Sequence, residues 1–290
     1  MEIEVQPTKW ANGIVEDLSM DLYRRTAAVA ASDLKNMQRS PAFARMRSHS
    51  TSPAKEWGTA VHTAILEPNM LDARYRVEPQ QPDDNDAKVW RATKLYKEGA
   101  AALMAEPGVE GVLSADDMES LRWIQQRVKE NAIGAQLHEI GGIREGSVFC
   151  HDDEFRVWRK VRPDWLIPQT GVVIDVKTGA DHRPRQFARA CHAYGYHLSA
   201  AYYLDTLTAA LDQSFDHYVF LVVNSDAPHE VATYTLDADS IEQGRHEYRR
   251  ALAHWRECEE TGRWPGGSSK IEELRLPEYA INFHKLEENF

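Results

Sequence analysis

The sequence contains few cysteines: three in 290 residues, at Cys150, Cys191 and Cys258. They are widely spaced, odd in number and without a C-x-x-C pair. This pattern argues against both a disulfide framework and a structural zinc site. Because such sparse thiols are typical of a reducing compartment, we expect the protein in the cytoplasm.

The sequence also lacks long apolar runs. No stretch approaches the ~18 consecutive apolar residues of a transmembrane helix, so a membrane is not an expected partner. The opening MEIEVQPTKWANG lacks the basic-then-apolar pattern of a signal peptide. Hydrophobic residues make up 42% of the chain, which suits a globular protein of one large domain or two small ones.

Positive charge is scarce overall but concentrated in one segment. The net charge of −11 argues against a protein that simply coats nucleic acid. Residues 156–189 nevertheless hold only three acids and eight basic residues, namely Arg156, Arg159, Lys160, Arg162, Lys177, Arg183, Arg185 and Arg189. An acidic body with one basic strip suits an enzyme that confines a polyanion to one groove. The alternative is a set of ordinary solvated strand faces.

The stretch RPDWLIPQTGVVIDVKTG, residues 162–179, predicts a β-hairpin with a loop of about four residues, because two apolar runs flank the turn-like PQTG. The expected register pairs Ile167 with Val172, Leu166 with Val173 and Trp165 with Ile174. Asp164 then falls opposite Asp175, an unfavourable pairing of like charges unless a positive charge intervenes. Lys177 follows on the same face of its strand. The pattern indicates a metal site with an adjacent ammonium group.

The rest of the chain divides into a weakly structured arm (1–30), a domain (31–265) and a tail (266–290). Within the domain, residues 31–140 read as mainly helical and residues 141–262 as a sheet core. The expected helices include 57–68, 87–106, 115–134, 183–211 and 239–262, and the expected strands are 146–151, 154–161, 163–167, 171–177, 217–224 and 229–236. This order predicts an α/β fold with a mixed central sheet flanked by helices.

Pro163-Asp164 and Asp175-Val176-Lys177 resemble the signature of the PD-(D/E)xK nuclease superfamily. Further blocks narrow the resemblance: ASDLKNMQRSPAFARM, EWGTAVHTAILEP, RKVRPDWL, VIDVKTGAD and AYGYHLSAAYYLD. Together they resemble the RecE-type (exodeoxyribonuclease VIII) exonucleases of phage and prophage recombination modules, over roughly residues 30–280. The resemblance implies a restriction-endonuclease-like core.

The resemblance also implies roles for individual residues. The implied catalytic residues are Asp164, Asp175, Lys177 and Glu145, and the implied metal ligands are His62, Asp164, Asp175 and the peptide carbonyl of Val176. Lys177 is expected to activate or orient the attacking water, and Glu145 to support a second metal ion. Taken singly, His62 could instead be a core histidine, Glu145 a cap or solvated acid, and Lys177 a surface lysine.

Residues expected to contact DNA are Arg159, Arg162, Arg183, Arg185, Arg189 and Tyr203. Related nucleases carry a glutamine four residues before this tyrosine, but Ser199 stands there and is too short to reach a phosphate. Tyr196 and Tyr203 could equally serve in packing. Relatives that hold an iron–sulfur cluster need four cysteines, and this chain has three.

The implied activity is 5′-to-3′ digestion of linear double-stranded DNA, with two Mg²⁺ ions per site or Mn²⁺ as a substitute, leaving 3′ single strands for recombination. The implied partners are double-stranded DNA ends, a single-strand annealing protein and further copies of the chain in a homo-oligomeric ring. Two alternatives stay open: an endonuclease of the same fold, and a catalytically inactive DNA-binding module.

Overall fold

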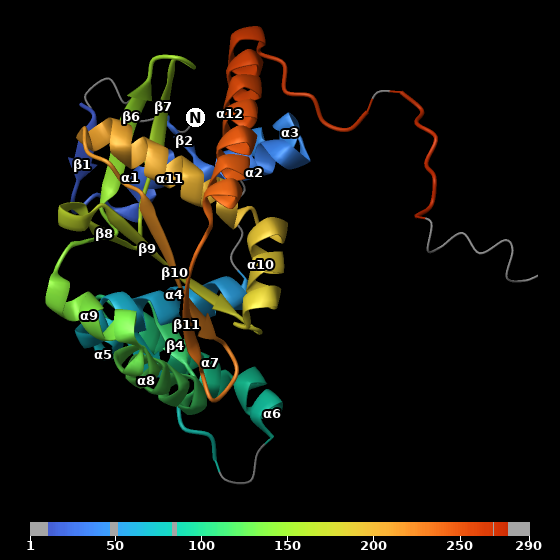
Figure 1. Ribbon diagram of the computed structural model, residues 1–290. Helices are drawn as coiled ribbons and strands as arrows, with labels where there is room; N and C mark the ends of the chain where they lie inside the picture. The colour runs from blue at the N-terminus through green and yellow to red at the C-terminus, as the bar shows by residue number, and fades with distance from the viewer. Residues whose placement is uncertain (1–10, 47–51, 83–85, 269, 278–290) are drawn as a thin grey trace, which may run out of the picture.

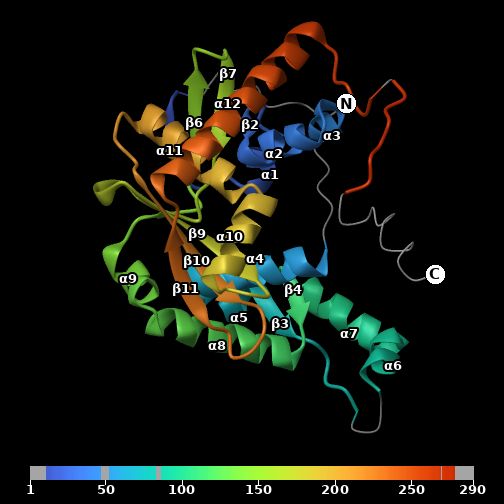
Figure 2. The same ribbon diagram turned by 45° about the vertical axis from the view of Figure 1, so that its right-hand side comes forward.

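The computed structural model describes residues 11–46, 52–82, 86–268 and 270–277. The first ten residues of the expected arm and the last thirteen of the expected tail lie outside the described residues. Within the described part, helices cover a five-stranded and a four-stranded β-sheet in a mixed α/β architecture, as Figures 1 and 2 show. The predicted fold class is confirmed.

The larger sheet has five strands in the order β11-β10-β9-β8-β5. Its strands are β5 (Ile143–Arg144), β8 (Trp165–Ile167), β9 (Val172–Gly179), β10 (His217–Asn224) and β11 (Val231–Thr235). Strands β9 and β10 run parallel and the other neighbours run antiparallel, so the sheet is mixed. The β8–β9 hairpin has the predicted register, with Trp165 opposite Ile174.

A second sheet has four strands in the order β1-β6-β7-β2. Its strands are β1 (Gly13–Val15), β2 (Val29–Ala30), β6 (Ser147–Asp152) and β7 (Val157–Val161). The prediction of one central sheet was therefore incomplete, because the strands expected at 146–161 pair with the N-terminal segment instead of with β8. The second of these strands begins at Val157 rather than at residue 154, because a turn precedes it in which Arg156 has φ 52°.

The expectation of a weakly structured arm was wrong for residues 11–30. This segment supplies β1, β2 and the helix α1 (Met20–Arg25). Lys160 on β7 fixes α1 in place, since its buried ammonium group donates to the carbonyl oxygens of Tyr23 and Thr26, both at 2.9 Å. A cation at these carbonyls also complements the helix C-terminus.

Three of the predicted helices are interrupted. The helices not yet given are α2 (Ala31–Arg39), α3 (Pro41–Met46), α4 (Pro53–Leu66), α5 (Leu71–Arg74), α6 (Ala87–Ala92), α7 (Lys94–Met104), α8 (Ala115–Glu130), α9 (Ala132–Ile140), α10 (Pro184–Ala193), α11 (Tyr196–Leu211) and α12 (Ala238–Thr261). Thr93 and Asn131 start new helices, because each side chain accepts hydrogen bonds from first-turn N–H groups. Gly195, with φ 62°, separates α10 from α11.

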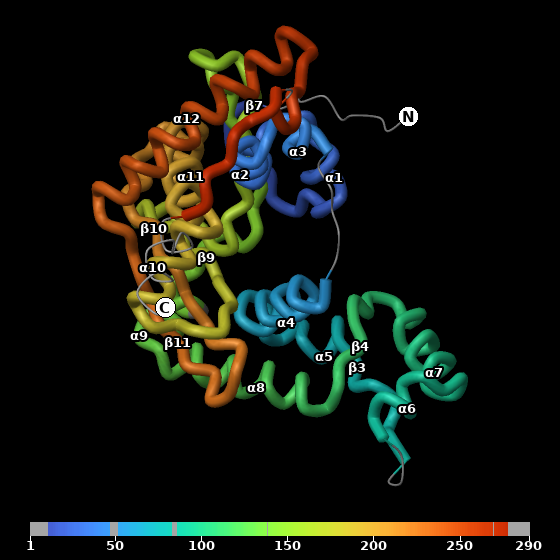
Figure 3. Tube along the Cα trace, turned by 90° about the vertical axis from the view of Figure 1, so that its right-hand side faces the viewer, coloured from blue at the N-terminus to red at the C-terminus, as the bar shows by residue number. Residues whose placement is uncertain are grey.

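The two faces of the larger sheet pack against different cores. Val173 and Phe220 belong to a cluster with α2, α11 and α12, whereas Ile174 and Val176 belong to a cluster with α4 and α8. Strands β3 (Tyr75–Val77) and β4 (Gly111–Leu113) form a small parallel pair. Together with α6 and α7 this pair lies at one end of the molecule (Figure 3). None of the helices in the described ranges is long and apolar enough to cross a membrane.

Candidate active site

The candidate active site lies where the chain passes between the two sheets. It leaves the larger sheet after β5 and enters the smaller one at β6, and it returns between β7 and β8. Glu145 occupies the first passage with φ 47°, and Asp164 occupies the second. The two passages are joined by a hydrogen bond from the Glu145 N–H to the Asp164 carbonyl oxygen, at 3.2 Å. Two predicted site residues are therefore held side by side by the backbone.

The Asp164 carboxylate has two fixed partners. One oxygen accepts a hydrogen bond from the Val176 N–H at 2.7 Å and lies 3.2 Å from Nε2 of His62. The other ring nitrogen of His62, Nδ1, lies 2.7 Å from the Gly58 carbonyl oxygen one turn earlier in α4. Burial alone would lower the pKa of His62, but the charge and hydrogen bond of Asp164 raise it to about 9. His62 is therefore an imidazolium paired with Asp164 at neutral pH.

Asp175 and Lys177 form the second half of the site. Their side chains point to the same side of β9, as period two requires, and form an ion pair. Burial lowers the pKa of Lys177, but the carboxylates of Asp175 and Asp164 outweigh it and raise that pKa above its ordinary value. Tyr218 on β10 lines the same cavity as Asp175 and Lys177, and burial together with the negative charge of Asp175 raises the pKa of its hydroxyl. Lys177 is thus an ammonium group held among acids, as the sequence predicts.

The side chains of Asp164, Asp175 and Lys177 line one cavity of about 280 Å³. Its lining comes from both sheets and from the N-terminal segment: Met20, Tyr23, Ala30, Ala31, Ser32, Lys35, Glu145, Arg162, Asp164, Asp175, Lys177, Tyr196, Ser199, Tyr203 and Tyr218. Burial raises the pKa of Glu145, an effect that Arg162 opposes and Asp164 adds to. The cavity therefore brings the carboxylates of Glu145, Asp164 and Asp175 together with the ammonium group of Lys177.

The donor types at this site fit a hard divalent cation, since carboxylate oxygens suit Mg²⁺ and an added imidazole is accepted by Mn²⁺. Among the residues that the structure describes, however, no three histidine, cysteine, aspartate or glutamate side chains already surround one point. Asp164 is engaged by His62, and Asp175 by Lys177. The predicted ligands thus meet in one region, and a cation has to compete with two ion pairs.

Residues 30–277 match the family model described as a PDDEXK-like domain of unknown function, DUF3799. This chain belongs to that family. The structure is also similar to the crystal structure of a candidate exonuclease from Eubacterium rectale, with a TM-score of 0.56 and 12% sequence identity, over 95% of this chain and 100% of that one. At such low identity the likeness shows a shared fold alone. No curated protein matches the sequence.

In this PDDEXK-like domain the two arginines nearest the signature have structural contacts. Arg159 is buried, with 6% of its surface exposed, and its Nε lies 3.3 Å from Asp152 Oδ2. The expectation that Arg159 contacts DNA was therefore wrong, because its guanidinium group is buried beside Asp152. Arg162 does line the cavity, but it donates to the Leu18 carbonyl at 2.7 Å and to Ser147 Oγ at 2.9 Å.

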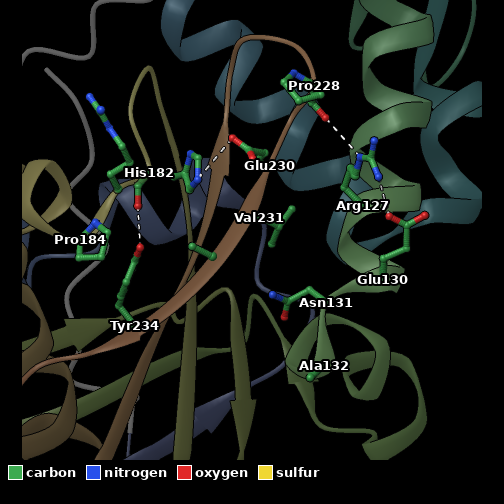
Figure 4. Close-up of a pocket in the computed structure, with 12 residues that line it drawn as sticks. Arg127, Glu130, Asn131, Ala132, His182, Pro184, Pro228, Glu230, Val231 and Tyr234 are labelled. Carbon is green, nitrogen blue, oxygen red and sulfur yellow. Dashed lines mark hydrogen bonds and ion pairs between the residues drawn. The ribbon is translucent and has the colours of Figure 1, made fainter.

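Arg183 lies at a different cavity from the carboxylates. That second cavity, of about 690 Å³, is formed by α8, β11 and the segment before α10, as Figure 4 shows. In it the Tyr234 hydroxyl donates to the His182 carbonyl at 2.7 Å, and His182 Nε2 lies 3.5 Å from Glu230. Arg183 is itself exposed and paired with Asp181. Arg185 and Arg189 are exposed on α10.

The tyrosines expected near the substrate are closely packed. Tyr203 lines the cavity, and its hydroxyl donates to the Arg162 carbonyl at 3.4 Å. Ser199, which stands at the glutamine position, also lines the cavity but donates to the Gly195 carbonyl at 3.3 Å. Both residues are half-buried in the cavity wall, and the contact of Tyr203 with DNA stays a prediction.

Sequence reasoning missed Lys35 and Tyr218. Lys35 lies on α2, far from the signature in sequence, and Tyr218 lies on β10 opposite Val173. The parallel pairing of β9 with β10 places Tyr218 beside Asp175, and that pairing depends on the crossover helices between them. The ASDLKNMQRSPAFARM block contains Lys35, but it entered only through the family resemblance, which assigns no role to this lysine.

Proposed function

We propose that this chain is a divalent-metal-dependent exonuclease that digests linear double-stranded DNA from its 5′ ends and leaves 3′ single strands. The observation that carries the proposal is the meeting of Asp164, Asp175 and Lys177 in one cavity, with His62 in contact with the Asp164 carboxylate. The PDDEXK-like family and the fold shared with a candidate exonuclease support it. Its resemblance to RecE-type nucleases supplies the polarity.

His62, Asp164, Asp175 and the Val176 carbonyl are the residues that would hold Mg²⁺, or Mn²⁺ in its place, with Glu145 supporting a second ion. Bound there, such ions neutralise charge on the phosphate and make a water molecule more acidic. Lys177 is an ammonium group, so its contribution is to orient that water and to supply a proton at Nζ. Tyr218 lines the same cavity, and burial and the negative charge of Asp175 raise the pKa of its hydroxyl.

The size of the cavity favours action at an end. About 280 Å³ is close to the lower end of the ~300–1,000 Å³ range of small-molecule pockets, which suits one phosphate with part of its nucleotide and not a duplex. The terminal nucleotide of a linear molecule is the easiest to unpair. A closed circle offers no such nucleotide. We further propose a single-strand annealing protein as the partner that receives the 3′ strand, and a homo-oligomeric ring that retains the duplex.

The test compares a linear duplex with a covalently closed circle of the same sequence in Mg²⁺. Labels at the 5′ or the 3′ ends report polarity. Early release of the 5′ label and survival of the circle support the proposal. Cutting of the circle favours an endonuclease of the same fold. Binding of DNA without cleavage in Mg²⁺ or Mn²⁺ favours an inactive binding module.

A further inference from the structure

The cavity contains two lysines that come from different parts of the fold. Lys177 belongs to β9, whereas Lys35 belongs to α2, which packs in the core on the other face of β9 from α4 (Figure 3). Their ammonium groups lie over the same ring, at 5.1 Å and 5.9 Å respectively from the centroid of Tyr196. Two like charges therefore face one small space.

Only one of these lysines has an acid partner. Lys177 is paired with Asp175, Asp164 is engaged by His62, and Glu145 lies 3.9 Å from Arg162. No carboxylate in the described part of the chain lies within ion-pair distance of Lys35. Burial and the charge of Lys177 lower the pKa of Lys35 to about 8, which Asp175 offsets only in part. The free protein holds an uncompensated positive charge there, so the missing complement is an anion.

The position of Lys35 is fixed by its surroundings. A Cβ built on Gly195 would lie 2.9 Å from Cδ of Lys35, so the absence of a side chain at this turn leaves room for the lysine stem. The N-terminus of α2 does not supply the anion site, because the Asp33 carboxylate already accepts from the Ala30 N–H at 2.9 Å. The contact to an anion therefore belongs to the Lys35 side chain.

We propose that Lys35 binds a non-bridging oxygen of the DNA phosphate that enters the cavity, from the wall that α2 forms. The inference rests on the function proposed above and adds a residue to it. A phosphodiester placed beside Asp164, Asp175 and Lys177 lies within reach of both lysines, and its negative charge removes the repulsion between them. Lys35 is thus a substrate-positioning residue that the free protein carries at a cost in stability.

The test uses Lys35→Gln and Lys35→Arg in the full chain, with Lys94→Gln as a matched control. Lys94 is 88% exposed on α7, at the far end of the molecule. Affinity for a linear duplex is measured in fixed Ca²⁺ at several salt concentrations. Removal of one lysine–phosphate interaction lowers the slope of log affinity against log salt by about 0.9. We expect this for Lys35→Gln alone, with Lys35→Arg and Lys94→Gln at the wild-type slope.

A second readout separates substrate binding from a structural role. Without DNA, Lys35→Gln should raise the melting temperature slightly, because it removes a half-buried charge that has no acid within ion-pair distance and faces Lys177. An unchanged salt slope, or a lower melting temperature together with weaker binding, overturns the inference. If the wild type cleaves linear DNA while the slope of Lys35→Gln is normal, only this inference fails. If the slope changes but the wild type cleaves nothing, the proposed function fails and the phosphate interaction stands.

Discussion

Replacement of Lys177 by alanine separates three properties of the site, namely stability, binding and chemistry. In the wild type this ammonium group compensates Asp175, whose side chain is 13% exposed, while that of Lys177 is 22% exposed. Breaking a buried pair by removing one partner costs about 3–5 kcal/mol. Because the pair borders a cavity, we expect about 3 kcal/mol, measured as the free energy of unfolding in urea without divalent ions.

This loss should depend on pH. Burial and the charge of Asp164 raise the pKa of Asp175 even with Lys177 present. Without the lysine, the folded-state pKa rises further above the unfolded value. A raised folded pKa gives stability that is present below the unfolded pKa and is lost as pH rises through the folded one. The cost of Lys177→Ala is therefore smaller near pH 4 than at pH 8.

The chemical effect should exceed the binding effect. Loss of one general acid–base contribution typically lowers a rate by ~10²- to 10⁴-fold, and we expect this scale in single-turnover cleavage of linear DNA by Lys177→Ala. Affinity for DNA in Ca²⁺, which accepts oxygen ligands with looser geometry, should change by less than about tenfold. Lys94→Ala serves as the control and should match the wild type. A cleavage rate that falls only in step with affinity would make Lys177 a phosphate-binding residue and refute its catalytic role.

Two further substitutions test the edges of the site. His62→Ala should lower metal-dependent cleavage by at least about 10-fold. The stability lost in this variant should shrink as pH rises from 6.5 to 9, because the wild-type imidazolium loses its proton over that range. A variant that melts at a lower temperature yet keeps full turnover would identify His62 as a core histidine. Neutralising Arg183, Arg185 and Arg189 together should lower the slope of log DNA affinity against log salt by about 0.9 for each phosphate that is no longer neutralised. The control Arg249→Gln, on α12, should leave this slope unchanged. An unchanged slope in the triple variant places the DNA elsewhere.

The sequence predicted best what depends on neighbours in the chain. Period two and a four-residue turn set the β8–β9 register, and this register puts Asp164 and Asp175 on the same side. Strand β10 begins and ends at the predicted residues, because a run of eight residues rich in valine and aromatic side chains favours a buried strand over a helix.

Features that depend on distant packing were not predicted. Strands β1 and β2 have three and two residues, too few to show a period, and they form only because β6 and β7 offer free edges. The basic strip counted Arg159 and Lys160 as surface charges, but both are buried. Their partners, Asp152 and the carbonyls that end α1, become visible only once the sheet is assembled.

The central claim is that Asp164 and Asp175 make this PDDEXK-like domain a divalent-metal-dependent nuclease. The most direct measurement is single-turnover cleavage of an end-labelled linear duplex against Mg²⁺ concentration, for the wild type, Asp164→Asn and Asp175→Asn, with calorimetric Mg²⁺ binding on the same samples. We predict that the wild type cleaves only when Mg²⁺ is present, and that the folded variants neither cleave DNA nor bind Mg²⁺. Normal turnover in either variant, or wild-type cleavage that persists in a chelator, would contradict the account.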